Sequence, residues 1–290
     1  MGSPRDLDGF IFDLDGCIWT GEDLVPGARE VIDRLRDLGK RVGFLTNNST
    51  QSARKVATRL RRMGIPAAAG MVVVSADLAG PYLASRHGHG KVLVIGSPAL
   101  RRSILRAGHT LVSWREVLEE GRIPDMVTAG MDVGFHYRKL TAAAVAVARG
   151  AFFYACNVDP RLPLEGGRFL PGTGSIARAI AVAAGADPAI IGKPEPPCFL
   201  EALRRLGTPP ARTAMVGDSP RSDIAGGRRA GLFTILLDAG GAGMGPGSGS
   251  SGPGSGTGTG QAEGEVIPHL RVQGMDELLA WISVPAHPRI

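Results

Sequence analysis

Four short stretches of this chain carry carboxylate, hydroxyl, amide and ammonium groups that could together transfer a phosphoryl group. They are residues 12–16 (FDLDG), 45–49 (LTNNS), 192–194 (GKP) and 217–223 (GDSPRSD). Each stretch follows a short apolar run that predicts a buried strand of a parallel sheet. In open α/β sheets, ligands bind at the edge where the carboxyl ends of the strands meet. We therefore expect the four stretches to converge on one site.

The first stretch offers a nucleophile beside a proton carrier. Asp13 and Asp15 are two residues apart, so in an extended chain both side chains point the same way. A carboxylate nucleophile with a neighbouring acid or base divides phosphoester hydrolysis into two easier steps. The pattern Asp-x-Asp-Gly also occurs as an ordinary turn after a strand. Asp13 and Asp15 therefore indicate phosphoryl transfer only in combination with the other three stretches.

The second stretch offers donors for phosphate oxygens. Thr46 provides a hydroxyl group, and the backbone amides of Asn47 and Asn48 provide N–H groups at the end of a predicted strand. The alternative is a helix cap, in which Asn48 or Ser49 caps a helix that begins near Ala53. The two interpretations are compatible with each other.

The third and fourth stretches complete the charge balance of such a site. Lys193 brings a cation that offsets two carboxylates and a phosphate, although a single lysine would otherwise be an ordinary surface residue. Asp218 and Asp223, together with Asp13, provide hard oxygen ligands for Mg²⁺. The alternative for the two later aspartates is a capped turn before a helix over residues 224–230. All four stretches together favour Mg²⁺-dependent phosphoryl transfer.

The elements that must position these residues alternate between short apolar runs and amphipathic helical patterns. This alternation is typical of a parallel sheet with crossover helices. In the core of the fold we expect strands at 9–12, 41–45, 71–74, 190–191, 213–216 and 233–237, a return of the chain at 271–272, and helices at 26–38, 53–63, 196–206 and 275–282.

A second α/β series interrupts this core. It consists of strands at 91–95, 126–129 and 151–156, a helix from Ser97 to Ala107, a helix from Thr141 to Arg149, a loop at 157–173 and a helix at 174–184. The predicted fold is thus α/β, with a doubly wound Rossmann-like parallel-sheet core and an inserted α/β cap domain. The length of 290 residues also favours two domains.

We predict a discontinuous core, residues 1–77 and 188–290, and a cap domain, residues 78–187. The segment 239–262 consists almost entirely of Gly, Ser, Thr, Pro and Ala, so it predicts a disordered loop without a catalytic part.

Composition excludes several classes of protein. The net charge is +6, but the basic residues are scattered along predicted helices, so we expect no nucleic-acid partner. There is no uncharged apolar run long enough to span a membrane, so we expect no membrane partner. The three cysteines, Cys17, Cys156 and Cys198, show no metal-ligand spacing and predict small buried residues in a reducing, cytoplasmic compartment.

With these stretches in order, the chain resembles haloacid dehalogenase superfamily phosphatases that carry a large cap, the NagD-like and 4-nitrophenylphosphatase-like group. Segments of the predicted cap share the resemblance: 130–132 (GMD), 135–141 (FHYRKLT) and 171–175 (PGTGS). The resemblance covers nearly the whole chain. It implies a homodimer formed through the cap.

The resemblance also implies a role for each site residue. Asp13 would be the nucleophile that forms an aspartyl phosphate, and Asp15 the general acid and then the general base. Thr46 and Asn47 would hold the phosphate, and Lys193 would balance its charge. Asp218 would bind Mg²⁺ with support from Asp223, and the backbone carbonyl of Asp15 would complete the protein's ligands.

The cap loop at 161–169 bears on the substrate. It resembles that of phosphoglycolate phosphatases more than that of pyridoxal phosphate phosphatases, which have His where this chain has Leu162. Arg161 and Arg168 either bind a substrate carboxylate or face water. We expect a small phosphorylated metabolite, 2-phosphoglycolate first. The alternatives are a nucleotide, sugar phosphate or aryl phosphate such as 4-nitrophenyl phosphate and, from another class, a non-catalytic sensor of a phosphorylated ligand.

Overall fold

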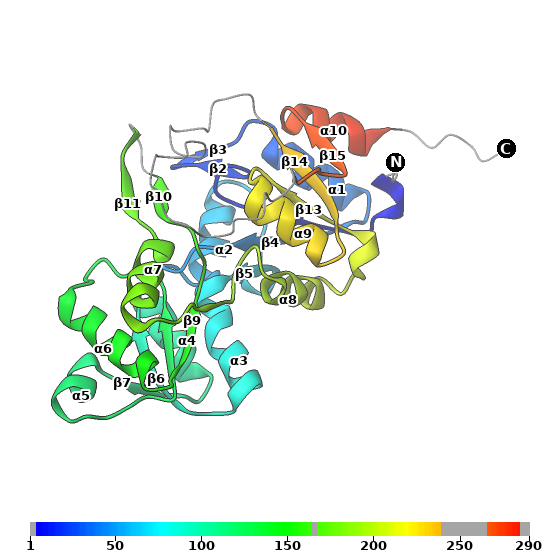
Figure 1. The fold of residues 1–290 in the computed structure, drawn as a ribbon. Coiled ribbons are helices and arrows are strands. Elements are labelled where there is room, and N and C mark those ends of the chain that lie inside the picture. The colour runs from blue at the N-terminus through cyan, green and yellow to red at the C-terminus, as the bar shows by residue number, and fades with distance from the viewer. Residues whose placement is uncertain (1–3, 164–166, 239–265, 285–290) are drawn as a thin grey trace. The chain divides into compact units, whose positions relative to one another are not determined.

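The computed structural model describes residues 4–163, 167–238 and 266–284 (Figure 1). The chain divides into two compact units: a first unit of residues 1–42 and 207–290, and a second unit of residues 43–206. These boundaries are not those of the predicted core and cap, and the division at 78–187 stays a prediction. The Gly-rich segment 239–262 lies outside the described residues.

The first unit contains four parallel strands in the order β15-β14-β13-β1. Their bounds are β1 (Gly9–Phe12), β13 (Thr213–Gly217), β14 (Phe233–Leu237) and β15 (Leu270–Val272). All four residues of β1 and all five of β13 are buried, as expected for apolar strands inside a parallel sheet. Strands were predicted at these places, so the α/β fold class is confirmed here.

Two helices of the first unit pack on each other: α1 (Ala28–Asp37) and α10 (Met275–Ser283). The face of α1 that carries Val31, Ile32 and Leu35 is buried, as its sequence spacing predicts. Leu38 was expected on the same face, but it lies at the C-terminal cap and is exposed. Gly39 follows with a φ of 71°, the left-handed conformation that commonly ends a helix.

Two features of the first unit differ from the expected elements. A single α-helix was predicted over 224–230, but a π-helical turn (Pro220–Ile224) leads into a short α9 (Ala225–Arg229). In addition, β2 (Trp19–Thr20) and β3 (Asp23–Leu24) form an antiparallel hairpin just after the Asp-x-Asp stretch. Both features are too short for hydrophobic periodicity to reveal.

The second unit is built on a five-stranded parallel sheet in the order β12-β9-β8-β6-β7. The strands are β6 (Lys91–Ile95), β7 (Thr110–Val112), β8 (Met126–Ala129), β9 (Phe152–Ala155) and β12 (Ala189–Ile190). Strand β4 (Arg41–Thr46) starts in the first unit, and its end pairs with β5 (Val72–Val74) in the second. The prediction that the strand at 190–191 returns to the core sheet is wrong, because β12 pairs with β9.

Seven α-helices are described in this unit. They are α2 (Ala53–Arg62), α3 (Ser75–His87), α4 (Pro98–Arg106), α5 (Trp114–Glu119), α6 (Tyr137–Ala148), α7 (Thr173–Ala184) and α8 (Pro196–Leu206). The sequence did not predict α3, which contains Pro81 and lacks a clear apolar stripe. Tertiary contact supports it instead. Gly80 lies so close to α4 that any side chain there would collide with the backbone oxygen of Ser103.

The predicted start is correct for α4 and wrong for α6. Ser97 caps α4 as predicted, since its side chain accepts from the amide of Leu100 at 3.2 Å. Thr141 does not begin α6; it lies one turn inside, and its hydroxyl donates to the carbonyl of Tyr137 at 3.0 Å. The expected start of that helix was therefore too late.

The cap of α2 comes from a distant residue. Neither Asn48 nor Ser49 caps this helix; the amide of Ala53 instead donates to a carboxylate oxygen of Asp77 at 2.6 Å. Asp77 lies 24 residues further along the chain, beyond the reach of a local capping rule.

The loop predicted at 157–173 is partly regular. Strands β10 (Arg161–Pro163) and β11 (Phe169–Pro171) pair as an antiparallel hairpin. The three cysteines are buried, as predicted, and form no disulfide with one another, and burial raises the pKa of the Cys156 thiol to about 12. Among the described residues, no helix has the length and hydropathy that a membrane crossing would need.

Candidate active site

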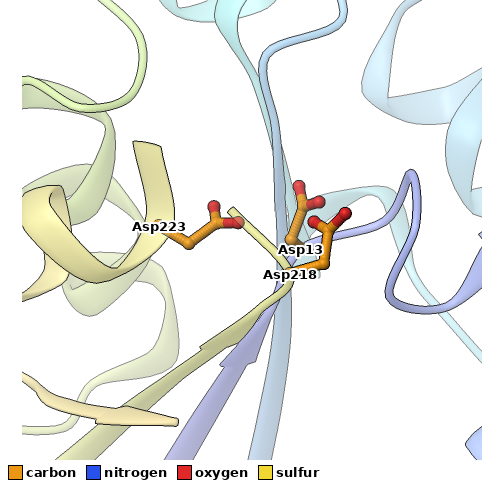
Figure 2. Close-up of side chains that lie close together, drawn as sticks. All are labelled: Asp13, Asp218 and Asp223. Atoms are coloured by element: carbon orange, nitrogen blue, oxygen red, sulfur yellow. The ribbon is translucent and has the colours of Figure 1, made fainter. Parts of the chain in front are cut away.

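Three carboxylates of the first unit lie together at the carboxyl ends of β1 and β13 (Figure 2). Asp13, Asp218 and Asp223 each contribute one oxygen, and these oxygens all lie within 4.8 Å of one another. Asp13 and Asp223 are 5% and 0% exposed, whereas Asp218 is exposed. Close, buried carboxylates repel each other unless a cation or protons neutralise them. This group of hard oxygens is therefore suited to a divalent cation such as Mg²⁺.

The sheet explains why these residues meet. Phe12 lies opposite Val216 in the parallel pair of β1 and β13, so Asp13 and Asp218 both follow at the same edge. The amide of Asp13 continues the pairing by donating to the carbonyl of Val216 at 2.8 Å. Two residues that are about 200 positions apart in sequence are thus neighbours for a purely topological reason.

The π-helical turn brings the third carboxylate back to the edge. The Asp223 amide donates to the Ser219 carbonyl at 3.0 Å, and the Asp223 carboxylate accepts from the Ser219 amide at 3.1 Å. Asp223 packs directly over Gly217, where any side chain would collide with its carboxylate. Gly16 faces Asp218 in the same way and has a φ of 89°, so glycine is required at both places.

Asp15 has a different environment from Asp13. The group of three carboxylates does not include its side chain, which is exposed and accepts a 2.8 Å hydrogen bond from the indole nitrogen of Trp19. The amides of Ile18 and Trp19 both donate to the carbonyl of Leu14, which tightens the turn. Asp15 is thereby held in one orientation by a buried ring. The predicted metal contact of its backbone carbonyl stays a prediction.

The stretch 45–49 lies in the second unit. Thr46 ends β4 and is 3% exposed, and its hydroxyl oxygen accepts from the amide of Asn48 at 3.1 Å. The Asn48 carboxamide accepts from the amides of Thr50 and Gln51. Two of the predicted phosphate ligands, Thr46 and Asn48, thus also stabilise the loop itself.

Lys193 is fixed against the same loop through its backbone. Its amide donates to Asn47 Oδ1 at 2.8 Å, and Asn47 Nδ2 donates back to the Lys193 carbonyl at 3.1 Å. Lys193 is 3% exposed, which is rare for lysine and sets it apart from an ordinary surface residue. The structure therefore brings the second and third predicted stretches into direct contact.

The two candidate specificity residues lie on the β10–β11 segment. Arg161 and Arg168 are both exposed, and the Arg161 guanidinium lies over the Phe169 ring, 4.3 Å from its centre. A cation–π contact of this kind stabilises the hairpin. It gives Arg161 a structural partner besides any substrate.

The predicted residues thus form two groups, the aspartates in the first unit and Thr46, Asn47, Asn48 and Lys193 in the second. The convergence of both groups on one site stays a prediction. Sequence reasoning missed Asn157 and Asp159, which contact Asn47. They directly follow a buried strand, so the rule that found the other stretches would have found them as well.

Two comparisons of sequence bear on this site. Residues 10–110 match the family of haloacid dehalogenase-like hydrolases, and residues 190–245 match a second family, described as HAD-hydrolase-like. The chain is 38% identical to human glycerol-3-phosphate phosphatase over 80% of this chain and 78% of that protein. It is 36% identical to an acid sugar phosphatase of Staphylococcus aureus, over 81% and 88% of the two chains.

Solved structures agree with the sequence matches. A 4-nitrophenylphosphatase from Thermotoga maritima aligns with a TM-score of 0.78 and 29% identity, over 96% of this chain and 98% of that one. A glycerol phosphate phosphatase from Mycobacterium tuberculosis, solved in complex with magnesium, aligns with a TM-score of 0.73 and 34% identity. That alignment covers 82% of this chain and 69% of the other.

Proposed function

This chain belongs to the haloacid dehalogenase-like hydrolases and is a phosphatase, and we propose that it hydrolyses a small phosphomonoester with Mg²⁺ through an aspartyl phosphate. The observation that carries the proposal is the group of three carboxylates at the ends of β1 and β13. A sensor without catalysis would not require a buried nucleophile, a cation site and a positioned second aspartate together.

The residues present fit a magnesium ion. Asp13, Asp218 and Asp223 offer only oxygen donors, and two of them are buried close enough to need a compensating cation. The ion, when bound, would neutralise charge on the phosphate and orient it. Neither nitrogen nor sulfur ligands belong to the group, which argues against a zinc site.

The chain's own residues would perform the following steps. A carboxylate oxygen of Asp13 attacks phosphorus, the bond from phosphorus to the ester oxygen breaks, and Asp15 protonates the departing alcohol. Asp15 then removes a proton from water, whose oxygen attacks the aspartyl phosphate and releases phosphate and free Asp13. Thr46, backbone amides of its loop and Lys193 would hold the phosphate oxygens during both steps.

For the substrate, 2-phosphoglycolate remains our first candidate, because Arg161 and Arg168 offer cations on the β10–β11 segment for a second anionic group. Glycerol 3-phosphate is the second candidate. It is supported by the names of the human and mycobacterial relatives. The contact of Arg161 with Phe169 also supports it, because glycerol 3-phosphate has no carboxylate and so does not require Arg161 as a ligand. Sugar phosphates, nucleotides and aryl phosphates complete the range.

A panel of phosphomonoesters tests this proposal. Turnover of 2-phosphoglycolate, glycerol 3-phosphate, a sugar phosphate, a nucleotide and 4-nitrophenyl phosphate would be measured with Mg²⁺ and with excess EDTA. We expect Mg²⁺-dependent release of phosphate, with the highest kcat/KM for a small aliphatic substrate. Absence of turnover on the whole panel would contradict a general phosphomonoesterase.

We also propose that the enzyme acts as a homodimer formed through residues 78–187, and that it works in the cytoplasm without a nucleic-acid or membrane partner. The resemblance supports the dimer, and the scattered basic residues support the lack of a nucleic-acid partner. Light scattering that returns the mass of a monomer at micromolar concentration would contradict the dimer.

A further inference from the structure

The loop after β4 sits at the carboxyl edge of the five-stranded sheet in the second unit. Segments that follow β6, β8, β9 and β12 all donate hydrogen bonds to it. The bonds run from Ser97 Oγ to Ser49 O (2.6 Å), Met131 N to Ser49 Oγ (2.9 Å), Asn157 Nδ2 to Asn47 O (2.7 Å) and Lys193 N to Asn47 Oδ1 (2.8 Å). The loop is therefore held in place by hydrogen bonds from the carboxyl edge of this sheet.

The Asn47 carboxamide lies at the centre of this hydrogen-bond network. Its Nδ2 group donates to the Lys193 carbonyl at 3.1 Å and to a carboxylate oxygen of Asp159 at 3.0 Å. An ionised carboxylate can only accept hydrogen bonds, so Asp159 must face the NH₂ end of the amide and not its oxygen. This contact requires the same orientation of the Asn47 amide as the backbone of Lys193, whose carbonyl accepts from Nδ2 and whose amide donates to Oδ1. Asp159 therefore reinforces that orientation.

The Asn157 side chain links Asn47 to Asp159. Its Nδ2 group donates to the Asn47 carbonyl, and its Oδ1 accepts from the Asp159 amide at 3.1 Å. Asn157 is 5% exposed, so these bonds are shielded from water. Asp159 also anchors the start of α7, because its carbonyl accepts from the Gly174 amide at 2.9 Å.

We propose that Asn157 and Asp159 are positioning residues that act through Asn47 to fix the backbone of Lys193 and of the loop after β4. The inference rests on the proposed function, since it assumes that Lys193 and this loop hold the phosphate. Neither residue needs to touch the substrate. They keep the Asn47 carboxamide in one orientation. That orientation holds the Lys193 backbone, and so the base of the Lys193 side chain, in one position.

The first test compares two variants of Asp159. Asp159→Ala removes the acceptor, and we expect kcat/KM for 4-nitrophenyl phosphate to fall about ten- to a hundredfold, mainly through kcat. Asp159→Asn keeps an oxygen that can accept from Asn47 and should recover most of the loss. Asp187→Ala is the matched control, because Asp187 is exposed and pairs only weakly with Arg178 at 3.4 Å. It should keep wild-type kinetics.

A double-mutant cycle then separates an indirect role from a direct one. If Asp159 acts through Asn47, adding Asp159→Ala to Asn47→Ala should cost little beyond the single Asn47→Ala change. Fully additive losses would overturn the inference. So would an unchanged kcat/KM in Asp159→Ala, or equal losses in Asp159→Ala and Asp159→Asn.

A readout without catalysis distinguishes failure of this inference from failure of the proposed function. Amide hydrogen exchange at Lys193, measured by NMR, should be slow in the wild type and at least about tenfold faster in Asp159→Ala and Asn157→Ala. Unchanged exchange in both variants would overturn the positioning role whatever the activity. A wild type that hydrolyses nothing but shows the predicted exchange would overturn only the proposed function.

Discussion

Asp13 and Asp15 belong to one short motif but occupy opposite environments. Asp13 is buried beside two further carboxylates, whereas Asp15 is exposed and oriented by the Trp19 indole. A nucleophile benefits from a fixed position beside a cation site, and a proton carrier must reach both the leaving group and water. The two environments therefore match the two roles that we propose.

Replacing the nucleophile should abolish the reaction without unfolding the protein. We expect Asp13→Asn to lower kcat by at least about a thousandfold, because an amide is not a competent nucleophile. The change is nearly isosteric, so the circular dichroism spectrum should be retained. Asp187→Asn, the same change at an exposed site, should keep full activity. Substantial Mg²⁺-dependent turnover by Asp13→Asn would rule out the covalent mechanism.

The two arginines on the β10–β11 segment separate recognition from chemistry. If they bind a substrate carboxylate, Arg161→Ala and Arg168→Ala should each lower kcat/KM for 2-phosphoglycolate by about ten- to a hundredfold. Hydrolysis of 4-nitrophenyl phosphate should be largely retained. Arg178→Ala, at an exposed position on α7, is the control.

Other outcomes of this comparison are equally informative. Equal losses on both substrates would mean that the arginines stabilise the hairpin, as the contact of Arg161 with Phe169 already suggests for that residue. No loss on either substrate would remove the residue-level support for 2-phosphoglycolate.

At the scale of elements, the carboxylate group depends on how β13 ends. A strand, a π-helical turn and a five-residue helix follow one another from Thr213 to Arg229. The turn directs Asp223 back over Gly217, while Asp218 continues past the strand end toward Gly16. Small residues at these two positions allow the close approach of the carboxylates.

A side chain at Gly217 should therefore disturb the proposed metal site. We expect Gly217→Ala to lower the free energy of unfolding by about 1–3 kcal/mol, because the methyl group collides with the Asp223 carboxylate. The Mg²⁺ concentration for half-maximal activity should also rise. Gly70→Ala is the control, since a side chain there meets no atom within 4 Å. A Gly217→Ala variant with wild-type stability and Mg²⁺ response would contradict this account.

At the scale of the whole molecule, the carboxylate group joins distant parts of the chain. Asp13 precedes the second unit in sequence, and Asp218 and Asp223 follow it. A cation bound by all three favours the folded state, because the unfolded chain cannot bring them together. Metal binding and stability should thus be linked.

Removal and exchange of the metal test this link. Excess EDTA should abolish activity, Mg²⁺ should restore it, and Ca²⁺ should restore little, because its larger and looser shell suits the site less well. Mg²⁺ should also raise the Tm, measured by calorimetry, and Asp218→Asn should reduce that rise. Full activity in excess chelator would refute the role of the metal.

The sequence by itself determined the class of fold, the places of most strands and helices, and the family. Strands such as β1 and β13 are apolar throughout, and α1 carries a clear apolar face, so local periodicity was sufficient to predict them. The motif residues were also predictable, because each polar stretch follows directly after an apolar strand.

Only the tertiary structure decided which partners the shorter segments take. Ala189–Ile190 joins the five-stranded sheet, Asp77 caps a helix that begins 24 residues earlier, and Asp159 accepts a hydrogen bond from Asn47 across 112 positions. The physical reason is that two residues of strand, or one carboxylate, have no local preference among several partners. Their energy comes from hydrogen bonds that exist only once distant segments have been brought together.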